Sequence, residues 1–233
     1  ENNYYLSFSG RKDSTVLHYL LDIALPGNKI PRVYINTGIE YKDIRQFVEK
    51  LAKTDERIII INSGVNIKRM LEEEGYPFKS KEHSLKVSEY KKGSRATNII
   101  KYKEFRGQFS CPKKLLYQYE PSFTLKISNH CCYRLKKDIF KHWSKENHKS
   151  ITLTGMRKAE GGQRKNLNCF TNEGKKFHPL VSIPDEWMEQ FILKFEIKLC
   201  RLYYPPFNFK RTGCKGCPYN LHLQEDLDVM LEL

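Results

Sequence analysis

Apolar residues recur along the chain in two alternating patterns, short continuous runs and helical periods. Four short runs bounded by polar turns predict buried parallel strands at Tyr4–Phe8, Arg32–Asn36, Arg57–Asn62 and Ser150–Thr154. Five amphipathic stretches predict helices at Ser14–Leu25, Tyr41–Lys53, Asn66–Glu74, Cys132–Glu146 and Asp185–Phe195. Strands separated by helices favour right-handed βαβ units. We therefore expect an α/β, Rossmann-like doubly wound and mainly parallel sheet flanked by helices.

The stretch from residue 76 to residue 129 does not follow this alternation, and we interpret it as an insertion carried on the core. The predicted parts are residues 1–75, the insertion 76–129, and residues 130–233, which hold the second half of the core and a cysteine-rich C-terminal segment. No run of 18 apolar residues occurs, and the polar start passes directly into the first predicted strand. We expect no membrane span, no secretory leader and a cytoplasmic location.

Charge is high and unevenly distributed. The 233 residues include 41 Lys and Arg against 27 Asp and Glu, a net charge of +14. Basic residues outnumber acidic ones by eleven to three between Phe78 and Leu115. The basic residues are Lys79, Lys81, Lys86, Lys91, Lys92, Arg95, Lys101, Lys103, Arg106, Lys113 and Lys114, and aromatic residues lie among them at Tyr90, Tyr102, Phe105 and Phe109. Cations with interleaved aromatics suit nucleic acid, so the 79–114 segment is a candidate contact; the alternative is a solvated, lysine-rich surface.

The stretch Ser7–Ser14 indicates anion binding. A predicted strand leads through a short turn of serine and glycine into a predicted helix, an arrangement that gathers backbone amides around a phosphate. Gly10 lets the backbone approach closely, and Ser9 and Ser14 offer hydroxyl donors. Lys12 can meet a phosphate as a mobile charge. The alternative is an ordinary helix capped by Asp13 or Ser14.

The same residues carry a family resemblance. Ser9-Gly10-Arg11-Lys12-Asp13-Ser14 resembles the PP-loop of the adenine-nucleotide alpha-hydrolase superfamily, whose usual form is Ser-Gly-Gly-x-Asp-Ser. Arg11 stands where that family has its second glycine. The resemblance implies a nucleotide-binding first half with ATP or another adenine nucleotide at Ser7, Ser9, Gly10, Arg11, Lys12, Asp13 and Ser14. It also makes Lys12 and Asp13 candidate catalytic residues, with Asp13 a candidate ligand of Mg²⁺.

Two further segments match the family's order of motifs. Asn36-Thr37-Gly38 resembles its Asp-Thr-Gly segment, which closes over the adenosine end of the ligand, although Asn36 replaces the acid. The segment from Gly155 to Arg164 resembles the Gly-x-Arg-x-x-Glu-x-x-x-Arg loop, with Arg157, Glu160 and Arg164 in place. Two converging arginines suit a polyanion.

Four of the seven cysteines form a pattern. Cys131 and Cys132 are adjacent, 81 residues intervene, and Cys214 and Cys217 follow in a turn-rich CxxC. In a reducing compartment, clustered cysteines more often bind metal. Zinc commonly uses two CxxC pairs and suits adjacent cysteines poorly, whereas the separate irons of a cubane can each take one thiolate. We favour a [4Fe–4S] cluster, and the pattern resembles that of the adenylyl-sulfate (APS) reductases of the same superfamily.

Cys111 lies in Ser-Cys-Pro-Lys-Lys, inside the basic segment. A thiol among cations has a lowered pKa and greater nucleophilicity. Cys111 is therefore a candidate redox-active cysteine.

Three functions remain open for a protein that resembles the PAPS-reductase-like family. One is ATP-dependent adenylyl or sulfur transfer to a nucleic acid or small acceptor, favoured by Lys12-Asp13-Ser14, which resembles the ATP-pyrophosphatase loop. Another is sulfonucleotide (APS or PAPS) reduction, favoured by the cysteine quartet and opposed because the reductases' Glu-Cys-Gly-x-His segment does not occur. The third is non-catalytic nucleotide or nucleic-acid binding with a structural cluster. We favour the first; both enzymes would need a sulfur or electron donor.

Overall fold

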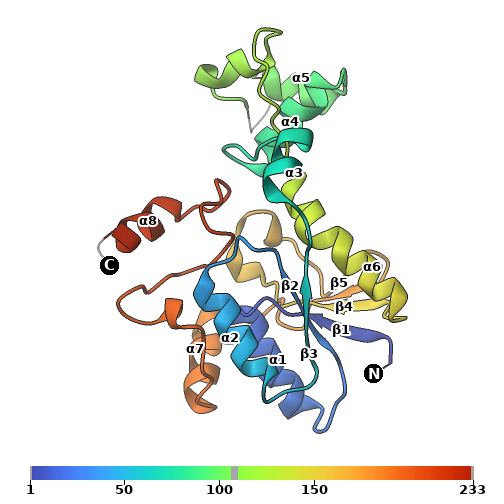
Figure 1. Ribbon diagram of the computed structural model, residues 1–233, viewed down its shortest axis with the longest axis vertical. Coiled ribbons are helices and arrows are strands. Elements are labelled where there is room, and N and C mark those ends of the chain that lie inside the picture. The colour runs from blue at the N-terminus through green and yellow to red at the C-terminus, as the bar shows by residue number, and fades with distance from the viewer. Residues whose placement is uncertain (1, 106–109, 232–233) are drawn as a thin grey trace. The chain divides into compact units, whose positions relative to one another are not determined.

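A computed structural model describes residues 2–105 and 110–231, which form two compact units (Figure 1). The first unit comprises Glu1–Ser63, Ile139–Lys215 and Gln224–Leu233, and the second comprises Gly64–Asp138 and Gly216–Leu223. The predicted insertion of residues 76–129 lies inside the second unit. The second unit contains more residues than the predicted insertion, because it also includes residues on either side of it and the stretch Gly216–Leu223.

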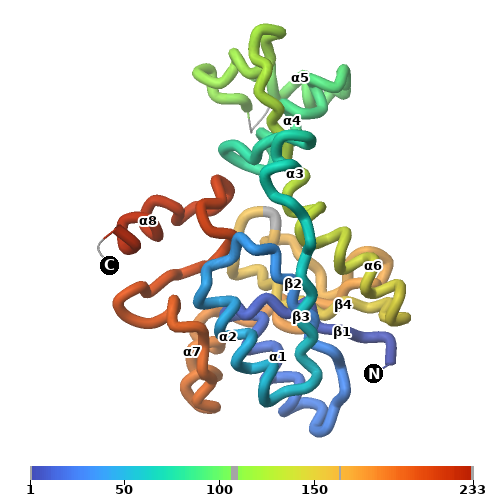
Figure 2. Tube along the Cα trace, viewed as in Figure 1, coloured from blue at the N-terminus to red at the C-terminus, as the bar shows by residue number. Residues whose placement is uncertain are grey.

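The first unit contains a six-stranded sheet in the order β3-β2-β1-β4-β6-β5. Its strands are β1 (Tyr4–Ser7), β2 (Arg32–Asn36), β3 (Ile58–Asn62), β4 (Ile151–Leu153), β5 (Phe170–Thr171) and β6 (Lys176–Phe177). Neighbouring strands are parallel except β5, which runs antiparallel to β6. Figure 2 traces β1 beside β4, although nearly 150 residues separate them. The predicted α/β fold with a mainly parallel sheet is confirmed.

Helices cover both faces of this sheet because successive strand residues point to opposite sides. Leu6 and Tyr34 pack in one apolar cluster with residues of α1 (Lys12–Ala24), α2 (Lys42–Ala52) and α7 (Asp185–Lys194). Their neighbours along the strands form the opposite cluster with α6 (Asp138–Glu146); these are Tyr5, Val33 and Ile35, packed against Ile139, Phe140 and Trp143. The four predicted strands and the helices α1, α2 and α7 all occur, with ends shifted by at most two residues.

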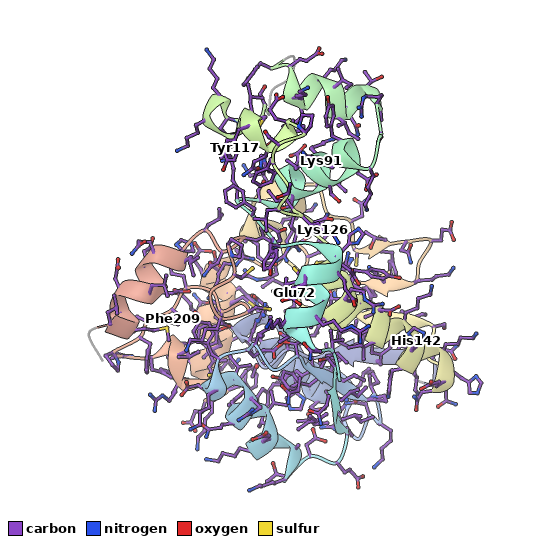
Figure 3. All side chains as sticks on the ribbon, turned by 45° about the horizontal axis from the view of Figure 1, so that its top comes forward. Glu72, Lys91, Tyr117, Lys126, His142 and Phe209 are labelled. Carbon is purple, nitrogen blue, oxygen red and sulfur yellow. The ribbon has the colours of Figure 1, made fainter. Side chains whose placement is uncertain are left out.

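The second unit is helical. It contains α3 (Ile67–Glu74), α4 (Lys81–Lys91), α5 (Thr97–Lys103) and the 3₁₀ helix η1 (Lys113–Tyr119). Its own apolar core consists of Val87, Tyr102, Cys111, Leu115, Tyr119 and Ile127. Figure 3 labels Lys91, Tyr117 and Lys126 of this unit. Helices α4 and α5 have too few apolar residues in helical period to be predicted, and this core stabilises them.

The predicted helix Cys132–Glu146 is present with a change of geometry. Its first part, Tyr133–Lys137, is a π-helix, and α6 continues from it. Single π-helical turns inside α-helices frequently occur at functional sites. Here the π-helix follows directly after Cys131 and Cys132. After α6, short 3₁₀ turns occur at η3 (Lys158–Glu160), η4 (Gly162–Arg164) and η5 (Arg201–Tyr203). Near the C-terminus, α8 spans Leu223–Leu231.

Candidate functional site

Two serine hydroxyls close the turn between β1 and α1. Ser9 Oγ and Ser14 Oγ lie 2.9 Å apart, and the Ser14 hydroxyl donates to the Arg11 carbonyl at 3.0 Å. Gly10 has a φ of 65°, and a Cβ added there would lie 2.5 Å from Val48. The turn therefore requires glycine at this position, both for its backbone conformation and for space.

The start of α1 lacks a side-chain cap. Arg11 occupies the N-cap position with an extended backbone, and its side chain makes no capping hydrogen bond. The Lys12 amide instead donates to the Tyr203 hydroxyl at 3.2 Å. Uncapped amides and the helix dipole give this end of α1 a partial positive charge that favours an anion.

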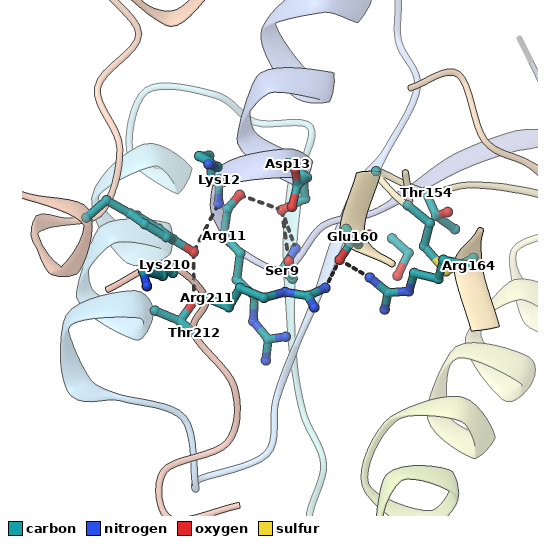
Figure 4. Close-up of a pocket in the computed structure, with 15 residues that line it drawn as sticks. Ser9, Arg11, Lys12, Asp13, Thr154, Glu160, Arg164, Lys210, Arg211 and Thr212 are labelled. Atoms are coloured by element: carbon teal, nitrogen blue, oxygen red, sulfur yellow. Dashed lines mark hydrogen bonds and ion pairs between the residues drawn. The ribbon is translucent and has the colours of Figure 1, made fainter. Parts of the chain in front are cut away.

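A cavity of about 280 Å³ opens at this helix start (Figure 4). Such a volume lies near the lower limit of typical ligand sites, roughly 300–1,000 Å³, and suits a phosphate chain better than a whole nucleotide. Five cationic side chains and two carboxylates are among its lining residues. The lining residues are Ser7, Ser9, Arg11, Lys12, Asp13, Ser14, Thr154, Gly155, Met156, Glu160, Arg164, Tyr203, Lys210, Arg211 and Thr212.

Glu160 lies between two arginines at the wall of the cavity (Figure 4). Its Oε2 accepts hydrogen bonds from Arg164 and from Arg211, and its Oε1 accepts from the Arg157 amide at 3.1 Å. The Glu160 side chain is only 8% exposed, whereas those of Arg164 and Arg211 are 40% and 44% exposed. A guanidinium has five N–H donors, so each arginine keeps donors that can bind a phosphate.

Arg157 has a different position from the one expected. It does not line the cavity; its guanidinium donates to Asp13 at 2.8 Å, to Asp185 at 2.7 Å and to the Ile183 carbonyl at 3.1 Å. Burial by itself would lower the pKa of Arg157, but the ion pairs with Asp185 and Asp13 outweigh burial and raise it. Arg157 therefore holds Asp13 in place, and the arginine that faces Arg164 across Glu160 is Arg211.

The segment before Cys214 supplies the residues that the sequence interpretation missed. Tyr203 accepts from the Lys12 amide and shares a 2.8 Å hydrogen bond with the Thr212 hydroxyl. Lys210 and Arg211 add two cations to the cavity. The sequence signal for Lys210 and Arg211 is a basic pair next to a cysteine motif, and that motif by itself indicates a metal site.

Asn36, Thr37 and Gly38 lie at the carboxyl end of β2 and are not among the residues that line the cavity. The Asn36 carboxamide accepts from the Gly38 amide at 3.1 Å, and the Thr37 amide donates to Glu40 at 3.0 Å. Thr37 is buried, and its hydroxyl has no hydrogen-bond partner among the described residues. A buried hydroxyl without a partner is costly and is often satisfied by a ligand or water, so an adenosine contact here stays a prediction.

Three of the four predicted metal ligands, Cys131, Cys132 and Cys217, belong to the second unit, and Cys214 belongs to the first. The Cys131 thiol donates to Cys132, which lowers the pKa of Cys132, and Lys81, Lys136 and Lys137 lower it further. The same hydrogen bond, together with burial, raises the pKa of Cys131. All described cysteines are free thiols.

These thiols fit metal chemistry, since the thiolate is the metal-binding form and nearby lysines favour it. Cys214 is half-buried and forms an isolated antiparallel bridge with Glu40, while the Lys215 amide donates to the Ile39 carbonyl at 2.7 Å. The bridge holds Cys214 in an ordered backbone. That all four thiolates bind one cluster stays a prediction from the sequence pattern.

Cys111 differs from its expected state. The residue is 1% exposed in the core of the second unit, and its thiol lies 3.5 Å from the Pro112 carbonyl. Burial raises the pKa of Cys111, which outweighs the opposite effect of Lys79. The expectation of a lowered pKa was wrong, because the neighbouring lysines in the sequence extend away from a buried sulfur.

The basic 79–114 segment is only partly available at the surface. Lys86 and Tyr102 are buried, and the Tyr102 hydroxyl shares a 3.1 Å hydrogen bond with His83. Arg106 and Phe109 lie outside the described residues. The other basic side chains are exposed except Lys103, which is half-buried against Tyr90. Among the helices of the described chain, none is long and apolar enough to cross a membrane.

Comparison with known proteins gives a family. Residues 3–220 match the model of the phosphoadenosine phosphosulfate reductase domain. A curated protein, Uncharacterized protein MJ0973 of Methanocaldococcus jannaschii, is 38% identical over 73 residues. That match covers 31% of this chain and only 17% of the relative.

Two solved structures have a similar fold. Phosphoadenylyl-sulfate (PAPS) reductase from Candida auris, in a phosphate complex, has a TM-score of 0.52 and 14% identity, with 91% of this chain and 81% of that chain covered. FMN adenylyltransferase from Candida glabrata has a TM-score of 0.50 and 14% identity, with 92% of this chain and 53% of that chain covered. At these identities the likeness concerns the fold alone.

Proposed function

This chain belongs to the phosphoadenosine phosphosulfate reductase domain family, and we propose that it binds an adenine nucleotide, ATP, by its phosphate chain in the cavity at the start of α1. The observation that carries the proposal is the convergence of three segments on this cavity. The serine turn, the loop that ends at Arg164 and the segment with Lys210 and Arg211 all contribute donors or cations. A polyphosphate would satisfy these donors together.

The proposed reaction is adenylyl transfer. A nucleophilic oxygen of the acceptor attacks the α-phosphorus, the bond to the β-phosphate oxygen breaks, and pyrophosphate leaves with the electron pair. Charge then develops on the leaving oxygens. Lys12, Arg164 and Arg211 line the cavity and would stabilise it, since preorganised cations act where charge forms. In sulfur transfer, a sulfur nucleophile from a donor would then attack the acceptor atom that bears the adenylylated oxygen, and AMP would leave with that oxygen.

Asp13 fits a role in holding Mg²⁺. Arg157 engages its Oδ1, and the carboxylate lines the same cavity as the cations. Mg²⁺ is commonly held by one or two carboxylates together with substrate phosphates. With nucleotide bound, Asp13 would be the carboxylate, and the metal would neutralise the phosphate chain.

A [4Fe–4S] cluster remains part of the proposal. On the spacing in the sequence, Cys131, Cys132, Cys214 and Cys217 would supply the thiolates. The free thiols and the three lysines near Cys132 support this donor set. When bound, such a cluster would supply electron transfer or a site that binds sulfur.

The experiment is an anaerobic incubation of the protein with ATP, APS or PAPS, followed by product analysis. Release of pyrophosphate from ATP with transfer of AMP to the acceptor supports adenylyl transfer, and release of free AMP after addition of a sulfur donor supports sulfur transfer. Sulfite from a sulfonucleotide, without ATP turnover, would support the reductase that the family also suggests. Nucleotide binding without turnover would favour a non-catalytic role.

The phosphate site has its own test by calorimetric titration with ATP. Arg211→Gln and Arg164→Gln should each weaken ATP binding about 10- to 100-fold, because a hydrogen bond to a charged group contributes about 1.5–3 kcal/mol. Arg201→Gln is the matched control, since Arg201 lies nearby in the chain, is 69% exposed and pairs with Asp43. Equal effects of all three substitutions would contradict the assignment.

A further inference from the structure

We infer that the second unit binds single-stranded nucleic acid in a second cavity, of about 440 Å³, between α4 and residues 123–130. This cavity shares no lining residue with the proposed nucleotide site. The lining residues that carry the argument are Ser88, Lys91, Lys92, Phe123, Lys126 and His130. Lys126 and His130 lie outside the basic segment that the sequence singled out.

Three ammonium groups are held at this cavity. Lys91 Nζ donates to the carbonyls of Glu120 and Phe123, the latter at 3.0 Å, and Lys126 Nζ donates to the Glu73 carbonyl at 3.2 Å. Each ammonium has three donors, so both lysines keep at least one for a ligand. Lys92, the third, is exposed and pairs loosely with Glu89 at 3.6 Å.

The acidic residues of the lining do not cancel these cations. Glu73 pairs with Arg69 at 2.6 Å, and Glu74 pairs with Arg134 at 2.8 Å. Neither arginine lines the cavity. Because the two carboxylates are compensated from outside, the three lysines set the sign of the cavity, which suits a phosphate.

The wall beside the lysines suits a base. The Phe123 ring lies there with Lys91 Nζ 5.8 Å from its centroid, and Leu125 is 52% exposed. Ser88 is 93% buried and lines the same cavity. An apolar wall, a hydroxyl and cations together match one nucleotide, with the base against the wall and the phosphate at the lysines.

A stacking surface continues from the same end of α4. The Arg95 guanidinium lies 4.2 Å from the centroid of the Tyr90 ring, and Lys103 Nζ lies 4.5 Å from it. Arg95 is exposed, and a guanidinium plane can stack on a further base. Cations beyond the cavity indicate a strand of several nucleotides. Entry of an unpaired base into the cavity requires that strand to be single.

That this strand is the acceptor of the proposed transfer depends on the function proposed above. The binding itself does not, because it is measured without nucleotide and at other residues. The two proposals can therefore fail separately.

The test is fluorescence anisotropy of the full chain with a labelled, unstructured 20-nucleotide RNA. The KCl concentration is varied from about 50 to about 300 mM, a range that includes physiological ionic strength. Lys91→Gln with Lys126→Gln should weaken binding about tenfold or more. It should also reduce the slope of log affinity against log salt by about 0.7 for each lost phosphate contact. Lys92→Glu is a second variant, in case the double variant folds poorly. Because Lys92 is exposed, this substitution should leave the fold intact and should also weaken RNA binding.

The matched control is Lys29→Gln with Lys68→Gln, since these side chains are 79% and 86% exposed and the same charge is removed. An abasic 20-mer should bind at least about fivefold more weakly than the RNA, because base stacking contributes. Absent binding at the lowest salt, equal loss in the control, or equal binding of the abasic strand would each overturn the inference. Photocrosslinking of 4-thiouridine in the RNA should label peptides that contain Ser88–Lys92 or residues 123–130.

Discussion

Gly155 lies directly against Asp13, so that a Cβ added to Gly155 would be 2.9 Å from both the carbonyl carbon and the carbonyl oxygen of Asp13. The end of β4 and the first turn of α1 are thereby held in contact. Real Cβ atoms essentially never approach backbone this closely. The position of the start of α1 thus depends on the absence of a side chain 142 residues later in the chain.

The first prediction concerns this contact. Gly155→Ala should displace the start of α1, lower the free energy of unfolding by about 1–3 kcal/mol and weaken ATP binding at least tenfold. Urea denaturation and calorimetric titration measure the two effects. Gly213→Ala is the control, because no atom of the described residues lies within 4 Å of a Cβ there. An Ala variant at position 155 with unchanged ATP affinity would show that the contact does not position the site.

The second prediction concerns the hydroxyl of Tyr203. Tyr203→Phe removes the acceptor of the Lys12 amide and the partner of Thr212. Because both groups are partly buried, the free energy of unfolding should fall by about 1–2 kcal/mol. Tyr204→Phe removes a hydrogen bond to the Leu199 amide at a more exposed side chain, and should cost less than about 0.5 kcal/mol. ATP should stabilise the Tyr203→Phe protein more than the wild type, since a phosphate can replace the lost acceptor.

The third prediction concerns the pH dependence of stability. Burial, followed by the charge of Arg32, lowers the pKa of His18 to about 4, and the Arg32 Nε–H donates to His18 Nδ1 at 3.3 Å. The unfolded chain takes up this proton near pH 6.5, whereas the folded chain does not until about pH 4. Stability contributed by neutral His18 is therefore present above pH 6.5 and is lost as the pH falls from 6.5 towards 4.

The measurement is urea unfolding at several pH values between 7 and 4.5. Wild type should lose up to about 3 kcal/mol more than His18→Gln over this range. Other buried histidines contribute equally to both proteins, so the difference isolates His18. Parallel pH profiles would contradict the assignment.

The same network bears on metal binding. His18, Asp22 and Asp55 place ligand atoms within 4.8 Å of one another. Arg32 and Arg57 already engage Asp22, and the hydrogen bond from Arg32 leaves the proton of His18 on Nε2. A protonated nitrogen cannot ligate a metal, so we interpret the group as a structural ion-pair network.

The fourth prediction separates the cysteines. Cys131→Ser and Cys214→Ser should each reduce bound iron and the brown absorbance of anaerobically reconstituted protein. Cys169→Ser should leave both unchanged, because Cys169 is exposed and outside the quartet. Elemental analysis that finds zinc in place of iron would favour the tetrahedral zinc alternative. Full iron content in Cys214→Ser would remove Cys214 from the ligand set.

The periodicity of apolar residues in the sequence was enough to predict the main strands and helices of the first unit. Strand β2 occurs at its predicted bounds, because a run of apolar residues between polar turns has few alternatives to a buried strand. Strands β5 and β6 have two residues each, too few to show a period. They exist because each finds a partner in the sheet, which only tertiary structure supplies.

The chemistry of the site divides in the same way. The turn from Ser9 to Ser14 is local. Its glycine, its hydroxyls and the helix that follows are neighbours in the sequence, so the arrangement of strand, turn and helix could be predicted from them. Contacts between side chains that are distant in the sequence could not be predicted in this way. The ion pairs of Arg157 with Asp13 and Asp185 could not be predicted from the sequence. Nor could the hydrogen bond from Arg211 to Glu160. These contacts join segments up to 144 residues apart.

Cys111 shows the physical reason most directly. Its sequence neighbours are lysines, and sequence alone therefore assigned it a lowered pKa. The fold buries the sulfur among apolar side chains and lets the lysines extend to water, and burial raises the pKa instead. The sequence by itself determined which residue types are present and which segments form helices and strands. Only the tertiary structure decided which charges meet and which groups lose water, because both depend on distances that the order of residues does not contain.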